Sequence, residues 1–166
     1  HDELKGTRHG RSLLERVANV RTALPMLTTQ YRMHPDICAV VDKLFYSSRI
    51  VTAVQTRRER PEPLAMWWVE AAGEEQPLGT SMENPTEAAA VRRVCLWLLR
   101  HRPGKSVLVL TFYKAQLRAL CSLLWGDEKN PQLRDVRVLT VDAAQGQQGD
   151  IVVLSCVRTG ALGFSA

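Results

Sequence analysis

Two polar segments of this chain carry side chains that suit the chemistry of phosphates and nucleotides. In the first, residues 30–35, Tyr31 and Arg32 stand between a predicted extended stretch and a predicted helix start. The guanidinium of an arginine presents five donors in a planar fork that matches a phosphate, and a tyrosine ring has a face on which a base can stack. On residue types alone, a surface ion pair for Arg32 and a core position for Tyr31 are the simpler explanation. His34 is expected to cap the following helix rather than to act as a base.

The second segment, residues 141–150, connects two predicted strands through a polar turn. Gly146 and Gly149 would let backbone amides approach a ligand closely, because glycine has no Cβ. Gln148 offers an amide, which forms hydrogen bonds but cannot accept a proton as a carboxylate does. A tight polar connection between core strands is the alternative explanation.

A third candidate, residues 111–116, stands at the end of a predicted strand and the start of a predicted helix. A helix N-terminus beside the hydroxyl of Thr111 is a ready site for a phosphate. The alternative is that this hydroxyl only caps local structure.

Residues 102–106 contain Gly-Lys-Ser but do not form a phosphate loop. Leu99 stands where such a loop needs its first glycine, and the tripeptide follows a helix instead of opening one. No other Gly-Lys-Ser or Gly-Lys-Thr occurs in the sequence. We therefore expect no tight binding of ATP by this chain alone.

The composition is that of a globular chain of about one domain. Its 166 residues carry a net charge of +5 and a pI near 9.3, which permit an anionic partner such as nucleic acid without requiring one. No apolar run approaches the length of a membrane span, and the N-terminus lacks the apolar core of a secretion signal, so no membrane association is expected. Because the chain starts without Met, we expect it to be cut from a longer protein.

The cysteines lie far apart, with no Cys-x-x-Cys pair and no histidine at metal-ligand spacing. We expect them to be reduced and buried, which fits an intracellular protein of the cytoplasm or nucleus. The tryptophans are likewise expected in the core. The residues concerned are Cys38, Cys95, Cys121 and Cys156, and Trp67, Trp68, Trp97 and Trp125.

The N-terminal part of the chain predicts two helices separated by an extended stretch. Ser12 and Glu15 form a capping box, which predicts a short helix to about Asn19. After extended residues 23–31, Pro35 suits the first turn of a second helix. The apolar face expected on this helix comprises Ile37, Val40, Val41, Leu44 and Phe45. Further predictions are a charged loop at residues 55–63, a strand at residues 65–69 and a loop at residues 71–82.

The C-terminal part predicts strands that alternate with two helices. Asn84 is an N-cap followed by Pro85, Glu87 is interpreted as part of this cap only, and the helix ends before Pro103. A second helix is predicted at residues 114–125. The expected strands are residues 107–110, 136–141 and 151–154. Strands that alternate with helices imply a parallel sheet in an α/β fold.

Residues 30–35 and 141–150 together resemble motifs IV and V of superfamily-1 helicases of the up-frameshift type, which include the nonsense-mediated-decay helicase and senataxin. Residues 30–35 match without departure. The second segment follows the family pattern Thr-Val-Asp-x-x-Gln-Gly-x-Glu, then Asp and an apolar strand that ends in Ser-x-Val-Arg. One position of this segment departs, since Gln148 replaces the family Glu. At residues 111–116 the family has Thr-Pro-Tyr-x-x-Gln, and Phe112 replaces the Pro. The matching residues are Thr140, Gln145, Gly146, Asp150, Ser155 and Arg158.

The resemblance covers roughly residues 12–158 and implies an α/β domain with a RecA-like parallel sheet and helices on both faces. Residues 1–166 would form one such domain, the second lobe of a two-lobed motor, truncated before motif VI. Residues 1–22 would be a leading polar segment with a short helix. The first lobe, expected before His1, would supply the phosphate loop and the acids that bind Mg²⁺. A second arginine finger is expected beyond Ala166.

The resemblance also implies a role for each matching residue. Arg32 would be an arginine finger that reaches the γ-phosphate of ATP, and Tyr31 would stack near the adenine. Thr111 and Thr140 would hold consecutive phosphates of a single strand. The implied ATP contacts are Tyr31, Gln145, Gly146 and Gln148. The implied nucleic-acid contacts are Thr111, Tyr113, Thr140, Ser155 and Arg158, and no metal ligand is expected in this lobe.

The implied function is ATP-dependent movement along single-stranded nucleic acid, RNA being favoured over DNA, with unwinding of duplexes. Each hydrolysed ATP would accompany one step, usually 5′ to 3′, and the isolated chain would be inactive without the first lobe. Two alternatives stay open. One is a non-catalytic adaptor with a helicase-like domain. The departures at Gln148 and Phe112 slightly favour it, whereas the intact Arg32 speaks against it. The other is a helicase fused to a nuclease.

Overall fold

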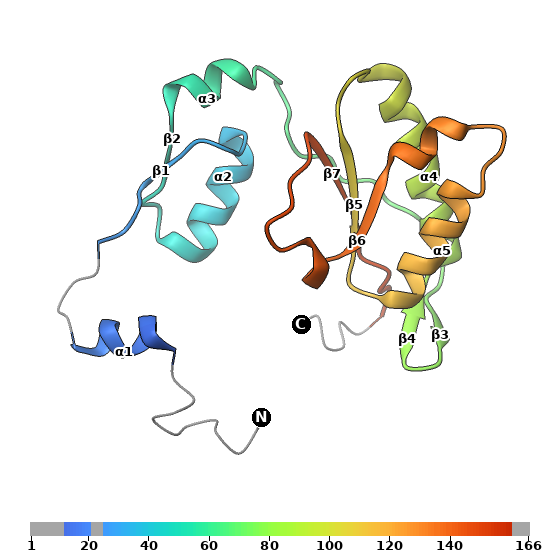
Figure 1. Ribbon diagram of the computed structural model, residues 1–166, viewed down its shortest axis with the longest axis horizontal. Helices are drawn as coiled ribbons and strands as arrows, with labels where there is room; N and C mark the ends of the chain where they lie inside the picture. Colours follow the sequence, from blue (N-terminus) through green and yellow to red (C-terminus); the bar gives the residue numbers. More distant parts are fainter. Residues whose placement is uncertain (1–11, 21–24, 161–166) are drawn as a thin grey trace. The chain divides into compact units, whose positions relative to one another are not determined.

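The computed structural model describes residues 12–20 and 25–160 of a chain that divides into two compact units, residues 1–68 and 69–166 (Figure 1). Each unit contains its own hydrogen-bonded strands. Among the described residues, no helix has the length and the apolar character needed to cross a membrane.

The first unit contains a short parallel strand pair and three short α-helices. Helix α1 begins as predicted, because the Ser12 hydroxyl accepts a hydrogen bond from the backbone N–H of Glu15 at 3.1 Å. Strand β1 pairs with β2 so that Gln30 lies beside Thr52. The elements are α1 (Leu13–Val20), β1 (Thr29–Gln30), α2 (Pro35–Val41), the π-helical turn η3 (Asp42–Tyr46), β2 (Val51–Thr52) and α3 (Val54–Glu59).

The apolar face predicted on the second helix is interrupted. Cys38 is buried, whereas Leu44 and Phe45 are exposed. The π-helical turn after Val41 has more residues per turn than an α-helix, so the side chains beyond it leave the line that Ile37 begins. The prediction of one continuous apolar face is therefore wrong beyond Val41, and Val40 of α2 is exposed as well.

Three further predictions for this stretch of the chain are wrong. Residues 55–63 are not all loop, because they include α3 (Val54–Glu59), in which Gln, Arg and Glu are good helix formers and which ends before Pro61. Residues 65–69 are not a strand, because within the described structure no other strand pairs with them. Residues 71–82 contain a hairpin of β3 (Gln76–Leu78) and β4 (Ser81–Glu83), with Gly79 at φ +63° in its two-residue turn.

The tryptophans are less buried than predicted. Trp67 and Trp68 are 68% and 88% exposed. Trp97 is half-exposed and stacks on His101 with ring centroids 4.7 Å apart, and the half-exposed Trp125 donates from its indole Nε1–H to the carbonyl oxygen of Val136 at 3.1 Å. An indole has an apolar body and a polar N–H edge. A position at the surface of a unit therefore suits it better than the centre of the core.

The second unit is built on a three-stranded parallel sheet in the order β6-β5-β7. Helix α4 starts as predicted, since the Asn84 Oδ1 accepts from the backbone N–H of Glu87 at 3.0 Å. Strand β5 pairs in parallel with both β6 and β7, and α5 connects β5 to β6, which confirms the predicted parallel α/β fold. The elements are α4 (Pro85–His101), β5 (Val107–Thr111), α5 (Lys114–Trp125), the 3₁₀ turn η4 (Pro131–Asp135), β6 (Arg137–Thr140), the 3₁₀ turn η5 (Asp142–Ala144) and β7 (Ile151–Ser155).

Helices α4 and α5 pack side by side on one face of this sheet (Figure 1). Alternate strand residues, including Val107 and Val109, share one hydrophobic core with Cys95 of α4 and Leu120 of α5. Burial raises the pKa of the Cys95 thiol to about 12, so this cysteine stays protonated and packs as a small apolar side chain.

The opposite face of the sheet carries Val152 and Leu154, which are 52% and 50% exposed. No α-helix described within this unit packs on that face, so the second layer of helices stays a prediction. The prediction that every cysteine is buried is wrong for Cys156, which is exposed, and Cys121 is only partly buried.

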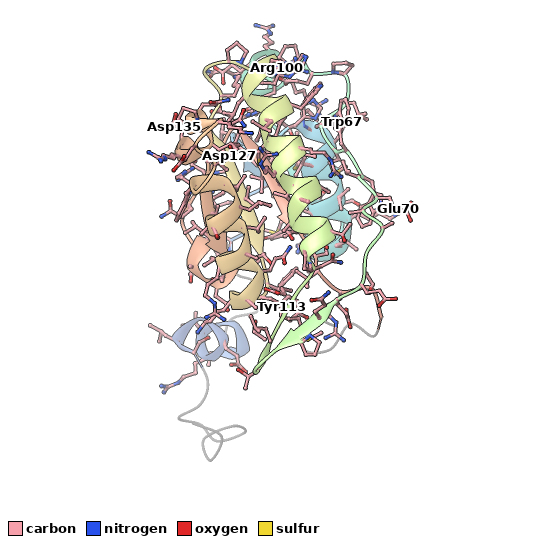
Figure 2. The ribbon with its side chains drawn as sticks, turned by 90° about the vertical axis from the view of Figure 1, so that its right-hand side faces the viewer. Trp67, Glu70, Arg100, Tyr113, Asp127 and Asp135 are labelled. Atoms are coloured by element: carbon pink, nitrogen blue, oxygen red, sulfur yellow. The ribbon has the colours of Figure 1, made fainter. Side chains whose placement is uncertain are left out.

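An ion pair fastens the C-terminal end of α5 to α4. The guanidinium Nε of Arg92 donates to Asp127 Oδ2 at 2.9 Å, and Arg92 Nη2 contacts the same oxygen. Lys129 N–H and Asn130 Nδ2 also donate to this carboxylate. Figure 2 shows Asp127 towards the end of the helix pair opposite to Tyr113. The hydrogen bond from Arg92 holds the pKa of Asp127 below its usual range.

We predict that replacing Asp127 by Asn lowers the melting temperature at pH 7 by about 5 °C. A depressed pKa in the folded state contributes stability that is present above the unfolded pKa and is lost as the pH falls through the folded pKa. The difference between wild type and variant should therefore be constant at neutral pH and shrink below about pH 4. Circular dichroism melts between acid and neutral pH measure it, with Asp135→Asn, an exposed aspartate of the same unit, as the control. A difference that persists undiminished in acid contradicts the prediction.

Candidate functional site

The side chain of Gln30 organises the turn that follows β1. Its Oε1 accepts hydrogen bonds from the backbone N–H groups of Arg32 at 2.8 Å and Met33 at 2.7 Å. Its Nε2 donates to the carbonyl oxygen of Met33 and to the hydroxyl of the buried Thr52, each at 2.8 Å. One amide therefore closes the turn and fastens it to β2, a role that sequence reasoning missed.

This turn presents the two side chains predicted to contact a nucleotide. Tyr31 is 70% exposed, so the alternative of a core position does not hold. Arg32 is exposed, and within residues 12–20 and 25–160 it forms no ion pair. An exposed guanidinium on a turn with fixed backbone can meet a phosphate on another molecule or domain.

His34 caps α2, as predicted. Its Nδ1 accepts from the backbone N–H of Asp36 at 3.1 Å, and its Nε2 lies 3.0 Å from the carbonyl oxygen of Glu62. Because a carbonyl oxygen can only accept, the contact with Glu62 needs a proton on Nε2. Both nitrogens are therefore used in structure.

In the second unit, three hydroxyl side chains end three neighbouring strands. Thr111 of β5 lies directly beside Thr140 of β6 and beside Ser155 of β7. We call these three residues the hydroxyl row. Parallel strands bring their carboxyl ends to one edge of the sheet, and α/β proteins bind ligands at that edge. The sequence predicts all three at or near strand ends, and the register of the sheet shows that they are neighbours.

The members of the hydroxyl row differ in access. Thr111 is fully buried, and its Oγ1 accepts from the backbone N–H of Tyr113 at 3.4 Å. Thr140 is partly exposed and accepts from the backbone N–H of Ala143 at 3.3 Å. Both threonines thus cap local turns, which was the alternative to phosphate binding, and their contacts with a strand stay predictions. Tyr113 is buried at the start of α5.

Ser155 is fully buried within a polar network. Its Oγ donates to Glu87 Oε1 at 2.7 Å and accepts from Gln116 Nε2 at 3.0 Å. Gln116 Oε1 in turn accepts from the backbone N–H of Asn84 at 2.9 Å. The cap at Asn84 is as predicted, but Glu87 does more than complete it. The only signal for this in the sequence was an acid and an amide near the two helix starts.

Residues 145–148 form an exposed loop whose ends are anchored. Gly146 has φ +78°, a conformation that glycine adopts without strain. Arg137 of β6 donates to the side-chain oxygen of Gln147 at 3.2 Å and to the carbonyl oxygen of Gln148. The side chains of Gln145 and Gln148 lie at the surface.

The far end of this loop is fixed by Asp150. Its Oδ2 accepts from the Ser106 N–H at 2.9 Å and from the Ser106 hydroxyl at 2.6 Å. Gly149 packs closely, since a Cβ there would lie 3.1 Å from the Cβ of Leu108. Gly149 thus serves packing against β5.

The predicted site residues are divided between the two units. Tyr31 and Arg32 share one turn of the first unit. In the second unit, the hydroxyl row, Tyr113 and Arg158 stand at or just beyond the carboxyl ends of the strands, whereas Gln147 and Gln148 of the 145–148 loop bond Arg137 at the start of β6. Among the residues that the structure describes, no cluster of three or more His, Cys, Asp or Glu side chains could hold a metal ion.

Comparison with known proteins identifies the family. A family model described as "AAA domain" matches residues 9–166. The chain is 34% identical over 145 residues to the mouse protein named 5′-3′ DNA helicase ZGRF1, covering 84% of this chain and 8% of that protein. It is 33% identical over 163 residues to the regulator of nonsense transcripts 1 homolog of Neurospora crassa, covering 89% of this chain and 15% of that protein.

A third relative is the human protein named probable helicase senataxin, which is 32% identical over 182 residues, with all of this chain and 7% of that protein covered. The chain thus spans a small part of the length of the relatives it matches. With the parallel sheet and the motifs described above, these matches show that the chain belongs to the AAA-domain family of superfamily-1 helicases of the up-frameshift and senataxin type.

Proposed function

We propose that this chain is the second motor lobe of an ATP-dependent helicase that moves along single-stranded nucleic acid and unwinds duplexes. The observation that carries the proposal is the hydroxyl row at the carboxyl edge of the sheet, where Thr111, Thr140 and Ser155 stand side by side. That edge is where an α/β sheet binds its ligand.

The proposed contacts with nucleic acid are made mainly to phosphates. Thr140, which is partly exposed, is the member of the hydroxyl row placed to touch a strand directly. Thr111, Tyr113 and Ser155 are buried and would act by shaping the edge beneath it, while Arg158 lies just beyond β7. Phosphate contacts position a strand without reading its bases. We propose RNA as the preferred partner, although one relative is named a DNA helicase.

The proposed contacts with ATP fit the exposed groups. Arg32 would stabilise charge on the γ-phosphate of an ATP held by a first lobe, and Tyr31 would stack near the adenine. Gln145, Gly146 and Gln148 would surround the nucleotide from the exposed loop. Bound ATP with Mg²⁺ supplies the phosphoanhydride bond whose hydrolysis drives the motor, and we expect the first lobe to supply the Mg²⁺ ligands.

Closing of the two lobes would bring Arg32 to the γ-phosphate and shift the phosphate contacts along the strand. Opening after hydrolysis would reset the lobe and complete one step along the strand. The movement would run in the 5′ to 3′ direction. Gln148 would hold a hydrogen bond without accepting a proton, because it is an amide. The isolated chain would be inactive. Its cysteines are unpaired, which supports our proposal of an intracellular protein of the cytoplasm or nucleus.

The decisive test is ATP hydrolysis by the complete polypeptide that carries this chain, with and without single-stranded RNA or DNA. Replacing Arg32 by Ala should lower kcat by about a hundredfold or more, because an arginine finger acts on charge that develops in the transition state. Arg58→Ala, which removes an exposed arginine of the same unit, is the matched control and should retain the wild-type rate. Equal rates for Arg32→Ala and wild type would reject the role of Arg32. A wild-type protein that binds a strand without hydrolysing ATP would favour the adaptor.

Replacing Gln30 by Ala should loosen the turn that presents Arg32. The N–H groups of Arg32 and Met33 would lose their acceptor, so we expect their amide hydrogen exchange to accelerate and the free energy of unfolding to fall by about 1–3 kcal/mol. The kcat for ATP should fall about tenfold, less than for Arg32→Ala, since the guanidinium is still present. Gln55→Ala, which removes an exposed hydrogen bond to Glu59, is the control and should change neither quantity. Unchanged exchange at residues 32 and 33 would disprove this role for Gln30.

Replacing Thr140 by Ala should weaken strand binding by about three- to tenfold, the value of one hydrogen bond. Because the proposed contact is to a phosphate, the factor should be the same for homopolymers of different bases. Fluorescence anisotropy with labelled RNA and DNA oligonucleotides measures the Kd and also settles which of the two binds more tightly. Thr80→Ala, in the exposed turn of the β3–β4 hairpin, is the control. A loss that depends on the base would contradict a phosphate contact.

A further inference from the structure

The chain leaves β7 through a strained turn. The backbone N–H of Arg158 donates to the carbonyl oxygen of Cys156 at 2.8 Å, which closes a γ-turn around Val157. Val157 has φ +71° and is fully buried. A β-branched residue in this region is a genuine outlier, because its side chain clashes with its own backbone. Such a conformation persists only where the surrounding structure determines it.

The carboxylate of Glu87 holds the near side of this turn. One oxygen accepts from the Ser155 hydroxyl at 2.7 Å, and the other accepts from the Val157 N–H at 2.9 Å. Asn84 Nδ2 donates to the carbonyl oxygen of Val157 at 3.4 Å. The start of α4 thus forms hydrogen bonds with the residues on both sides of Cys156.

The carboxylate of Glu75 holds the far side. Its Oε2 lies 3.0 Å from the guanidinium Nε of Arg158 and accepts from the backbone N–H of Thr159 at 2.8 Å. This ion pair holds the Arg158 side chain beside Glu75. Glu75 directly precedes β3, so the segment before this strand also holds the turn, together with the start of α4.

The hydrogen bonds that hold the turn extend to the hydroxyl row. Gln116 bonds Ser155 and the backbone of Asn84, and Ser155 is the neighbour of Thr111 in the sheet. Asn84, Gln116 and Ser155 are fully buried. A buried polar network whose members are satisfied is rigid and specifies one arrangement. The starts of α4 and α5 and the end of β7 are therefore fixed to each other.

Two carboxylates beside an edge proposed to bind phosphates would repel a strand if they faced it. Glu87 instead accepts hydrogen bonds on both of its oxygens, and Glu75 on Oε2, from groups of this chain. We infer that Glu87 and Glu75 are positioning residues, which hold the Val157 turn so that Arg158 and the hydroxyl row meet a single strand in one fixed geometry. This inference rests on the proposed function, because it assigns the network to strand binding.

The test compares Glu87→Gln and Glu87→Ala with wild type in the complete polypeptide. An amide has one acceptor oxygen, so Gln can serve the Ser155 hydroxyl or the Val157 N–H but not both, and Ala serves neither. We expect the Val157 amide to exchange about tenfold faster or more in the Ala variant, and the Gln variant to lose its acceptor for either the Val157 N–H or the Ser155 hydroxyl. The Kd for a labelled single-stranded oligonucleotide should rise about tenfold, while the KM for ATP stays within about twofold. Should the Ala variant fail to fold, the Gln variant carries the same comparison.

Asp127→Asn is the matched control, because it removes a carboxylate clamp at the other end of the helix pair (Figure 2). It should weaken the fold and leave strand binding unchanged. An equal rise of Kd in Asp127→Asn, or unchanged Val157 exchange in both Glu87 variants, overturns the inference. If wild type binds the strand and Glu87→Gln binds equally well, the positioning role alone fails. A wild-type protein that binds no strand overturns the proposed function itself.

Discussion

The pairing of β5 with both of its neighbours is the constraint on which the second unit depends. Val107, Leu108 and Val109 of this strand are buried, so β5 is fixed between the helices on one face and the 141–150 connection on the other. A parallel register has no freedom to slip by one residue, because every side chain would then change face. Once that register is set, Thr111, Thr140 and Ser155 have to share one row. The candidate site of this unit is thus a consequence of apolar burial elsewhere in the sheet.

Burying the end of a sheet creates polar groups that must find partners, and the second unit meets this need with side chains. Glu87 and Gln116 satisfy the Ser155 hydroxyl from the starts of α4 and α5. In the first unit, Gln30 does the same for a turn of three residues. In both places, a long polar side chain replaces missing backbone pairing and leaves the predicted contact residues in one defined position.

Long periodic segments of this chain are predictable from the sequence, and short ones are not. Helix α4 carries a cap, a proline and an apolar stripe over many residues, and β5 is a continuous apolar run. Helix α3 and the β3–β4 hairpin are too short for a periodic pattern, and only Gly79 marked the hairpin. For the site, strand ends and local motifs located Thr111, Thr140 and Arg32. The roles of Glu87 and Gln116 depend on partners 68 and 39 residues away, which no local pattern can show.

The charge at position 87 explains why this network needs an acid and not an amide. Ser155 and Val157 both present donors to it, and only a carboxylate offers acceptors on both of its oxygens. The same carboxylate lies in the first turn of α4, where the helix dipole favours a negative charge. Glu87 is partly buried, and the cost of removing its carboxylate from water is offset by two hydrogen bonds and by the helix terminus. The acid also suits a strained turn, because charge-assisted hydrogen bonds are the strong ones and can hold Val157 in a conformation that its own side chain opposes.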